Sequence, residues 1–268
     1  MQETFLTIII KDNISISAID AIQRQPFANW ECIIANNSVE NLEKYIADDS
    51  RFLVLSTADK IENVNTAIQK AKGKYIIIIN SDDIFVQNAF SDIFYMADLT
   101  DAPVIKYGTD KNVSEVFDDD HKCIFQYVIK RDMIIESVFD NLSSFCFQKD
   151  IIQKYKYGVP EQIFTMNAVC DVSTMTKTNQ ICLLQSEILD DYNSSDYVNI
   201  IDNFQKLKNK FPDIFWKKYF GVIIPNLTRK MMTNQSRADF VYCCGKIPLK
   251  FVPSRYKFMY FLFKHINK

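Results

Sequence analysis

The stretch Tyr75-Ile-Ile-Ile-Ile-Asn-Ser-Asp-Asp83 decides the fold class. Residues 75–79 form an apolar run of strand length, which is typical of a strand buried on both faces. Polar residues follow at once, so two adjacent carboxylates, Asp82 and Asp83, stand where the strand ends. Carboxylates placed in this way can bind Mg²⁺ or Mn²⁺ together with substrate phosphates. The same Ser-Asp-Asp pattern is also typical of a helix N-cap, and the residues alone leave both interpretations open.

Strand-like and helix-like segments alternate before this stretch. Strands are expected over 5–10, 30–35 and 52–55. Helices are expected over 15–24, 41–47 and 61–72, with Gly73 as the C-cap of the last. This alternation indicates parallel βαβ units, in which ligands bind beyond the carboxyl ends of the strands. Three polar loops should therefore share one rim of the sheet: 10–13, 36–39 and 80–83.

The rest of the chain is less regular. Further strands are expected over 104–107, 123–129 and 181–184, and further helices over 148–156 and 166–177. Beyond about residue 199 the pattern is helical and basic. The sequence therefore predicts an α/β domain over residues 1–198 and a helical, basic C-terminal region over residues 199–268.

Charge and cysteine content exclude several classes of protein. The 31 Lys and Arg residues against 33 Asp and Glu exclude a globally basic nucleic-acid binder, and no nucleic-acid partner is expected. The seven cysteines show no Cys-x-x-Cys pair and the chain has two histidines, which argues against a zinc site or a disulfide framework. No apolar run reaches the ~18 residues of a spanning helix, and a secretory leader is not expected. A cytoplasmic protein is predicted.

Charge is distributed unevenly along the chain. Residues 203–268 hold 14 Lys and Arg against two acids, and residues 246–268 hold six basic and six aromatic residues with no acid. This composition is typical of a segment on an anionic membrane, which predicts peripheral contact with the inner face of the cell membrane. The alternative is a helix packed on the first domain or on a second copy of the chain.

Two motifs resemble those of the inverting, nucleotide-sugar-dependent glycosyltransferases of family 2. Ala71-Lys-Gly-Lys-Tyr-Ile-Ile-Ile-Ile-Asn-Ser-Asp-Asp83 is similar to A-K-G-E-Y-I-x-F-L-D-S-D-D of that family. Gln25-Pro-Phe-Ala-Asn-Trp-Glu-Cys-Ile-Ile-Ala-Asn-Asn37 is similar to Q-T-Y-x-N-F-E-I-I-I-V-D-D. The resemblance covers residues 5–100 well and 140–192 weakly. It implies a GT-A (Rossmann-like) fold, with a mostly parallel sheet flanked by helices.

The resemblance assigns roles to several residues. It makes Asp83 the carboxylate that faces a Mn²⁺ or Mg²⁺ ion, and Asp82 a contact to the ribose or to a metal-bound water. Asn80 stands where many members have Asp. The implied nucleotide-sugar-binding residues also include Ile10, Asn13, Asn37, Lys60 and Asn65. Asn37 takes the place of an Asp that reads the base, and Lys60 is assigned to the diphosphate because Val64 replaces the family's Arg.

The position of the catalytic base departs from the family pattern. The family supplies this acid from a Glu-Asp pair that opens a helix about 14 residues before a strand. Counting back from Ile181 gives Met166-Asn167, where no carboxylate exists. Asp171 lies one helical turn further on and is the substitute candidate for the catalytic base, unless it is a solvated helix residue.

The resemblance implies a metal-assisted glycosyltransferase. It would move a sugar, with inversion, from a nucleotide-sugar donor, expected to be a UDP-sugar, to a bacterial surface glycan or a lipid-linked acceptor. The alternative is a catalytically degenerate relative that binds glycans or nucleotide sugars or serves as a scaffold. The departures at Asn37, Val64, Asn80 and residues 166–167 favour this alternative.

Overall fold

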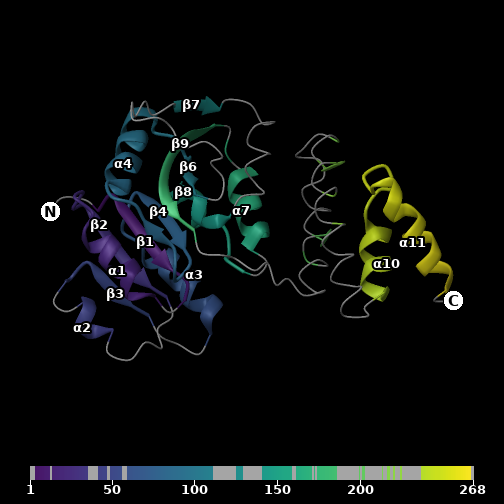
Figure 1. Ribbon diagram of the computed structural model, residues 1–268, viewed down its shortest axis with the longest axis horizontal. Helices are drawn as coiled ribbons and strands as arrows, with labels where there is room; N and C mark the ends of the chain where they lie inside the picture. Colours follow the sequence, from purple (N-terminus) through teal and green to yellow (C-terminus); the bar gives the residue numbers. More distant parts are fainter. Residues whose placement is uncertain are drawn as a thin grey trace. The chain divides into compact units, whose positions relative to one another are not determined.

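The computed structural model divides the chain into two compact units, Met1–Ile188 and Leu189–Lys268 (Figure 1). The domain boundary expected after residue 198 falls among residues that are not described, so it stays a prediction. The structure describes residues 4–12, 14–35, 42–46, 49–55, 59–110, 125–128, 141–158, 161–170, 172, 174–185 and 237–266, together with isolated positions between 199 and 224.

The first unit is built on one nine-stranded sheet, whose strands follow the order β3-β2-β1-β4-β8-β6-β9-β5, with β7 paired to β9. The strands are β1 Leu6–Ile10, β2 Trp30–Ile34, β3 Phe52–Val54, β4 Tyr75–Ile79, β5 Ile84–Phe85, β6 Val104–Thr109, β7 Phe125–Val128, β8 Phe145–Gln148 and β9 Met175–Leu184. The sheet is parallel from β3 to β4 and mixed beyond, because β8 pairs antiparallel with both β4 and β6.

The central strands β1 and β4 are buried along their whole length. They pair in parallel register, with Leu6 opposite Tyr75 and Ile10 opposite Ile79. Both runs are apolar without alternation, as strands covered on both faces require. Since Ile10 and Ile79 end the two strands side by side, the residues that follow them begin at the same edge of the sheet.

Helices cover the sheet, and two of them begin with side-chain caps. The helices of the first unit are α1 Ile16–Gln23, α2 Glu43–Ile46, α3 Lys60–Lys70, α4 Ala89–Thr100, α6 Lys149–Ile152 and α7 Glu161–Cys170, with a 3-10 turn, η1, over Leu142–Ser144. Ser15 accepts a hydrogen bond from Ala18 N at the start of α1, and Asp59 accepts one from Glu62 N at the start of α3. Apolar residues of α1 and α4 share one core cluster with β1 and β4.

Three predictions of secondary structure are wrong. Helix α3 ends with Ala71 as its C-cap, so Gly73 is not the cap. The helix expected over 148–156 is short, since residues 145–148 form β8 and α6 covers residues 149–152. The helix expected over 166–177 is α7, which runs from residue 161 to residue 170, and β9 begins at residue 175 instead of 181.

Gly73 has a packing role instead. A Cβ atom at this position would lie 2.6 Å from Thr7 N and 2.8 Å from the Leu6 carbonyl carbon. The Gly73 N–H donates to Thr7 Oγ1 at 2.9 Å. The glycine therefore lets the chain pass close to β1 just before β4 begins.

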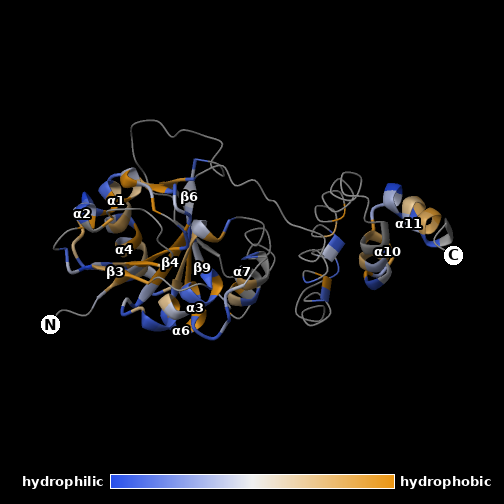
Figure 2. Cartoon of the chain, turned by 90° about the horizontal axis from the view of Figure 1, so that it is seen from below, coloured by the Kyte–Doolittle hydropathy of each residue, from blue (hydrophilic) through white to orange (hydrophobic). Residues whose placement is uncertain are grey.

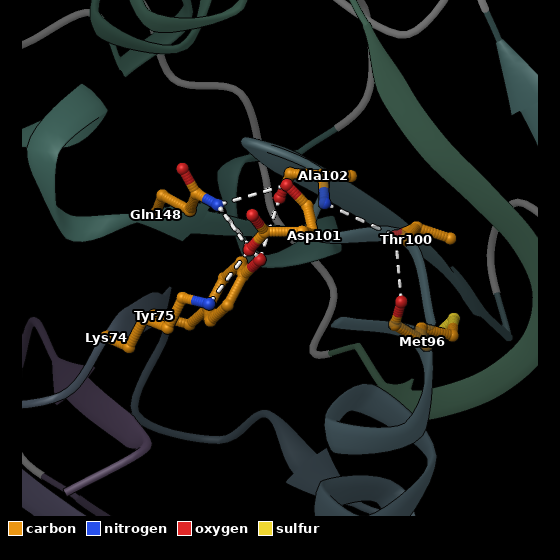
Figure 3. A network of polar contacts seen from close by, with 7 residues as sticks. All are labelled: Lys74, Tyr75, Met96, Thr100, Asp101, Ala102 and Gln148. Atoms are coloured by element: carbon orange, nitrogen blue, oxygen red, sulfur yellow. Dashed lines mark hydrogen bonds and ion pairs between the residues drawn. The ribbon is translucent and has the colours of Figure 1, made fainter. Parts of the chain in front are cut away.

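A polar network ties the amino end of β4 to the end of α4 (Figure 3). Lys74 Nζ lies 2.8 Å from Asp101 Oδ1, and Gln148 Nε2 donates to the Tyr75 hydroxyl at 3.2 Å. The Tyr75 hydroxyl donates to Ala102 O at 2.9 Å, and burial raises the pKa of Tyr75 to about 12. This network lies at the end of β4 opposite to Asp82 and Asp83, so it fixes the strand from behind.

The described part of the second unit contains the helices α10 Arg237–Lys246 and α11 Ser254–Ile266. Cys243 and Cys244 are buried free thiols, and burial raises the pKa of Cys244 to about 12. Figure 2 shows hydrophobic residues along α11. Among the described residues, no helix has the length and apolar character needed to cross a membrane.

Candidate functional site

A cavity of about 690 Å³ opens at the carboxyl edge of β1, within the size range of small-molecule sites. The loop after β1, the start of α3 and the start of α7 supply its walls. The lining residues are Lys11, Asp12, Asp59, Lys60, Ile61, Val64, Tyr157 and Glu161. The loop expected at the rim after β1 therefore does border a cavity, and it brings charged groups of both signs together.

A buried lysine forms one wall of this cavity. The Lys11 side chain is only 8% exposed and pairs with Glu161, the first residue of α7. Tyr157 donates its hydroxyl hydrogen bond to the same Glu161 oxygen at 2.5 Å. Lys11 N also donates to Ile79 O, which ties the pair to the end of β4. A lysine and a carboxylate are thus held together at the edge where β1 and β4 end.

Asn65 holds the segment that precedes α7. Its Oδ1 accepts from Tyr157 N at 2.8 Å, and its Nδ2 donates to Tyr157 O at 3.1 Å. The same Nδ2 lies 2.9 Å from Ile61 O. The amide of Asn65 is therefore used to position Tyr157, so Asn65 shapes the cavity wall from outside it.

A second ion pair lies at the cavity rim. Lys60 Nζ is 3.0 Å from Asp12 Oδ1, and both side chains are exposed. Lys60 is the first residue of α3, and Asp59 caps that helix. Since solvent-exposed pairs of this kind contribute little to stability, the Lys60 ammonium can exchange Asp12 for an anionic ligand at small cost.

The acidic loop after β4 forms a turn, not the start of a helix. Asp83 is fully buried, and its Oδ2 accepts hydrogen bonds from Asn80 N at 2.9 Å and from Asn80 Nδ2 at 3.1 Å. Asp82 is exposed, with Ser81 Oγ 3.5 Å from its Oδ2. The next helix, α4, begins at Ala89. The N-cap interpretation of this loop is therefore wrong, and the turn directs one carboxylate to solvent.

The donor set at this loop fits a hard cation only with help from a ligand. Within the described ranges, no group of three or more His, Cys, Asp or Glu side chains is arranged to hold a metal ion. The exposed Asp82 provides one carboxylate, and Mg²⁺ typically takes one or two carboxylates together with substrate phosphates. The residues present therefore fit a Mg²⁺ or Mn²⁺ ion that arrives with a diphosphate.

The remaining predicted site residues divide into two groups. Ile10 is fully buried, and its carbonyl accepts from Ala35 N at 2.8 Å, so it acts through packing and backbone. Asn13, Asn37 and Asp171 lie outside the described residues. Their assigned roles stay predictions.

Sequence reasoning missed Lys11 and Glu161. Lys11 follows three isoleucines in the sequence, and a charged residue at the end of a buried strand was the available signal. Glu161 was missed because the strand after α7 was expected to begin at Ile181. Since β9 begins at Met175, the position 14 residues before this strand is Glu161.

The sequence matches the family described as Glycosyl transferase family 2 over residues 16–169, which is more than half of the chain. The chain belongs to this family. It is 28% identical over 131 residues to Glycosyltransferase GlyG of Streptococcus pneumoniae serotype 4, an alignment that covers 46% of this chain and 42% of the relative. The matched part is thus less than half of that relative's length.

Solved structures of glycosyltransferases share the fold. The crystal structure of S. aureus TarS 1-349 in complex with UDP-GlcNAc matches with a TM-score of 0.65 and 12% identity, covering 94% of this chain and 82% of that chain. Glucosyl-3-phosphoglycerate synthase from Mycobacterium tuberculosis, in complex with Mn²⁺ and UDP-glucose, matches with a TM-score of 0.52 and 13% identity, covering 79% and 81%. The expected family and the GT-A type of α/β fold are confirmed.

Proposed function

We propose that this family 2 chain transfers a sugar from a nucleoside-diphosphate sugar, expected to be a UDP-sugar, and that the donor binds in the cavity beside β1. The supporting observation is the pair of lysines in its lining, Lys11 and Lys60. Lysine ammonium groups bind phosphate oxygens through charge-assisted hydrogen bonds. The structural relatives were crystallised with UDP-GlcNAc and with UDP-glucose, which favours the same class of donor.

Metal assistance is part of this proposal. A bound Mg²⁺ or Mn²⁺ would supply positive charge that stabilises the leaving nucleoside diphosphate. Asp82 would hold it through its exposed carboxylate, while Asp83 fixes the turn by accepting from Asn80. This arrangement exchanges the roles that the sequence assigned to the two acids, and the assignment of Asp83 as the metal-facing carboxylate remains the competing version. The crystallised synthase from M. tuberculosis contains Mn²⁺ with UDP-glucose, which supports a metal site in this fold.

Calorimetry separates the two versions. UDP is titrated into the wild type and into Asp82→Ala, Asp83→Ala and Asp98→Ala, each with and without Mn²⁺. Asp98 is an exposed acid on α4 and serves as the matched control. We expect Asp82→Ala to lose the Mn²⁺-dependent part of UDP affinity and Asp98→Ala to keep it. If Asp83→Ala alone loses it and stays folded, Asp83 is the metal ligand. Absence of UDP binding by the wild type would contradict the proposal as a whole.

Inverting transfer requires a carboxylate that removes the proton from the acceptor hydroxyl as it attacks the sugar. Asp171 stays a candidate for this role. Glu161 is a second candidate, because it lies in the cavity wall and 14 residues before β9. Transfer rates of Asp171→Asn and Glu161→Gln decide between them, since loss of a catalytic base lowers the rate by about two to four powers of ten. Donor affinity should be unchanged in the variant that lacks the base.

We further propose that the acceptor is a bacterial surface glycan or a lipid-linked sugar, reached by a cytoplasmic protein that touches the membrane surface. The basic, aromatic composition of residues 246–268 supports this choice of acceptor. The alternative, a non-catalytic module that binds sugar nucleotides, is favoured by the amide at Asn80 where many family members have a carboxylate. Hydrolysis of UDP-sugars in the presence of Mn²⁺ distinguishes the two, because a binding module leaves the donor intact.

A further inference from the structure

Helix α11 packs on α10 through one face. Phe263 meets Phe240 of α10 edge to face, with ring centroids 5.9 Å apart. Tyr260 is 8% exposed, and its hydroxyl would lie 3.5 Å from a Cβ atom built on Gly245 of α10. These contacts bury the side of α11 that carries residues 260 and 263.

The opposite side of α11 carries an apolar stripe, which consists of Phe258, Phe261 and Leu262. Phe258 is 71% exposed, and Phe261 and Leu262 are each 44% exposed. Their spacing of three and four residues places them together on one helix face. An exposed aromatic and aliphatic stripe of this kind on a helix is a feature of interaction surfaces.

Cations flank the apolar stripe on both sides. At 100° per residue, Lys257 and Lys264 fall beside Phe261, while Arg255 falls beside Leu262. Arg255 and Lys264 are exposed and lie against tyrosine rings, at 4.6 Å from Tyr256 and 5.6 Å from Tyr260 respectively. Residues 246–268 contain no acid that could neutralise these charges.

We propose that α11 docks on an anionic lipid surface, with the apolar stripe in the headgroup boundary and the flanking cations on lipid phosphates. A bilayer of this kind offers an apolar layer and negative charge along the same plane, which matches the arrangement on α11. Two copies of α11 facing each other would bring like charges together along both flanks, which disfavours a dimer through this face. The inference goes beyond sugar transfer and does not depend on it.

Sedimentation of the full chain with vesicles tests the proposal. The vesicles are phosphatidylcholine alone or phosphatidylcholine with phosphatidylglycerol, at low and high salt. We expect binding to the anionic vesicles only, weakened by salt. Phe258→Ser with Phe261→Ser should reduce the partition coefficient roughly a hundredfold, because two exposed aromatic rings no longer enter the boundary.

Charge reversal separates lipid docking from simple stickiness. Arg255→Glu, Lys257→Glu and Lys264→Glu together should lower binding at least about a hundredfold, since each cation near the surface contributes about fivefold. Lys44→Glu, Lys70→Glu and Lys154→Glu change the net charge equally at exposed sites of the first unit, and this control should still bind.

Three outcomes would overturn the proposal. The first is negligible pelleting of the wild type with anionic vesicles at low salt. The second is a drop in the melting temperature of the Phe258→Ser, Phe261→Ser variant, because this would mean that the apolar stripe is covered within the protein. The third is a dimer in light scattering that the same double substitution converts to a monomer.

Discussion

Replacement of Gly73 by alanine should destabilise the first unit because the new methyl group has no room. Its Cβ would lie 2.6 Å from Thr7 N, 2.7 Å from Thr7 Oγ1 and 2.8 Å from the carbonyl carbon of Leu6. Two of these atoms belong to the backbone of β1, which is buried and paired on both sides. The neighbours therefore cannot rotate away, and either β1 or the turn before β4 must shift.

The magnitude follows from the clash and from one hydrogen bond. Overpacking a rigid site costs about 1–3 kcal/mol. The buried bond from Gly73 N to Thr7 Oγ1, at 2.9 Å, is weakened by the shift, which adds about 1 kcal/mol. The smaller entropy of the unfolded alanine chain offsets about 0.4–1 kcal/mol. We expect a net loss of about 2–3 kcal/mol, or a fall in melting temperature of about 4–12 °C for a unit of this size.

Urea unfolding followed by circular dichroism measures this loss, and Gly158→Ala provides the matched control. A Cβ atom at Gly158 would meet nothing within 4 Å. No glycine in the described part of the chain has a positive φ, so backbone strain plays no part at either position. Equal stability of Gly73→Ala and Gly158→Ala would refute the argument from close approach.

Two further predictions concern ion pairs of the first unit. A double-mutant cycle of Lys11→Met and Glu161→Gln should give a coupling of about 1–2 kcal/mol in urea unfolding, because the Lys11 side chain is 8% exposed and its partner 27% exposed; additive effects would contradict the pairing. The Arg51 guanidinium beside Asp49 lowers the pKa of that carboxyl. Asp49→Asn should therefore destabilise the protein at pH 7, and the difference from the wild type should shrink as the pH falls below about 4, where the wild-type carboxylate becomes protonated. A difference that persists or grows in acid would exclude this charge interaction.

The parallel part of the fold could be predicted from local sequence. β1, β4 and α1 lie within two residues of their expected ends, because apolar runs and helical spacing there agree with the final environment. β8 could not be predicted in this way. It is four residues long and is inserted between β4 and β6, so its conformation depends on strands that are distant in the sequence.

The start of β9 was missed for a related reason. Residues 175–178, Met-Thr-Lys-Thr, alternate between polar and apolar groups too weakly to distinguish a strand from the end of a helix. Pairing with β6 and β7 decides the conformation instead. The error moved the expected acid by six residues and hid Glu161. The acidic turn after β4 was located correctly, but which of its two carboxylates is exposed depends on the hydrogen bonds of Asn80.

The cavity beside β1 links ligand occupancy to the cooperative folding of the first unit. Its walls join residues 92 apart, through Asn65 and Tyr157, and 150 apart, through Lys11 and Glu161. A chain that has formed only its first three strands has no such cavity and cannot bind. Any ligand of the cavity therefore draws the unfolding equilibrium of the whole unit toward the native side, by about 2.7 kcal/mol at a concentration of one hundred times Kd. The melting temperature of this protein is in effect a reading of the free ligand concentration around it.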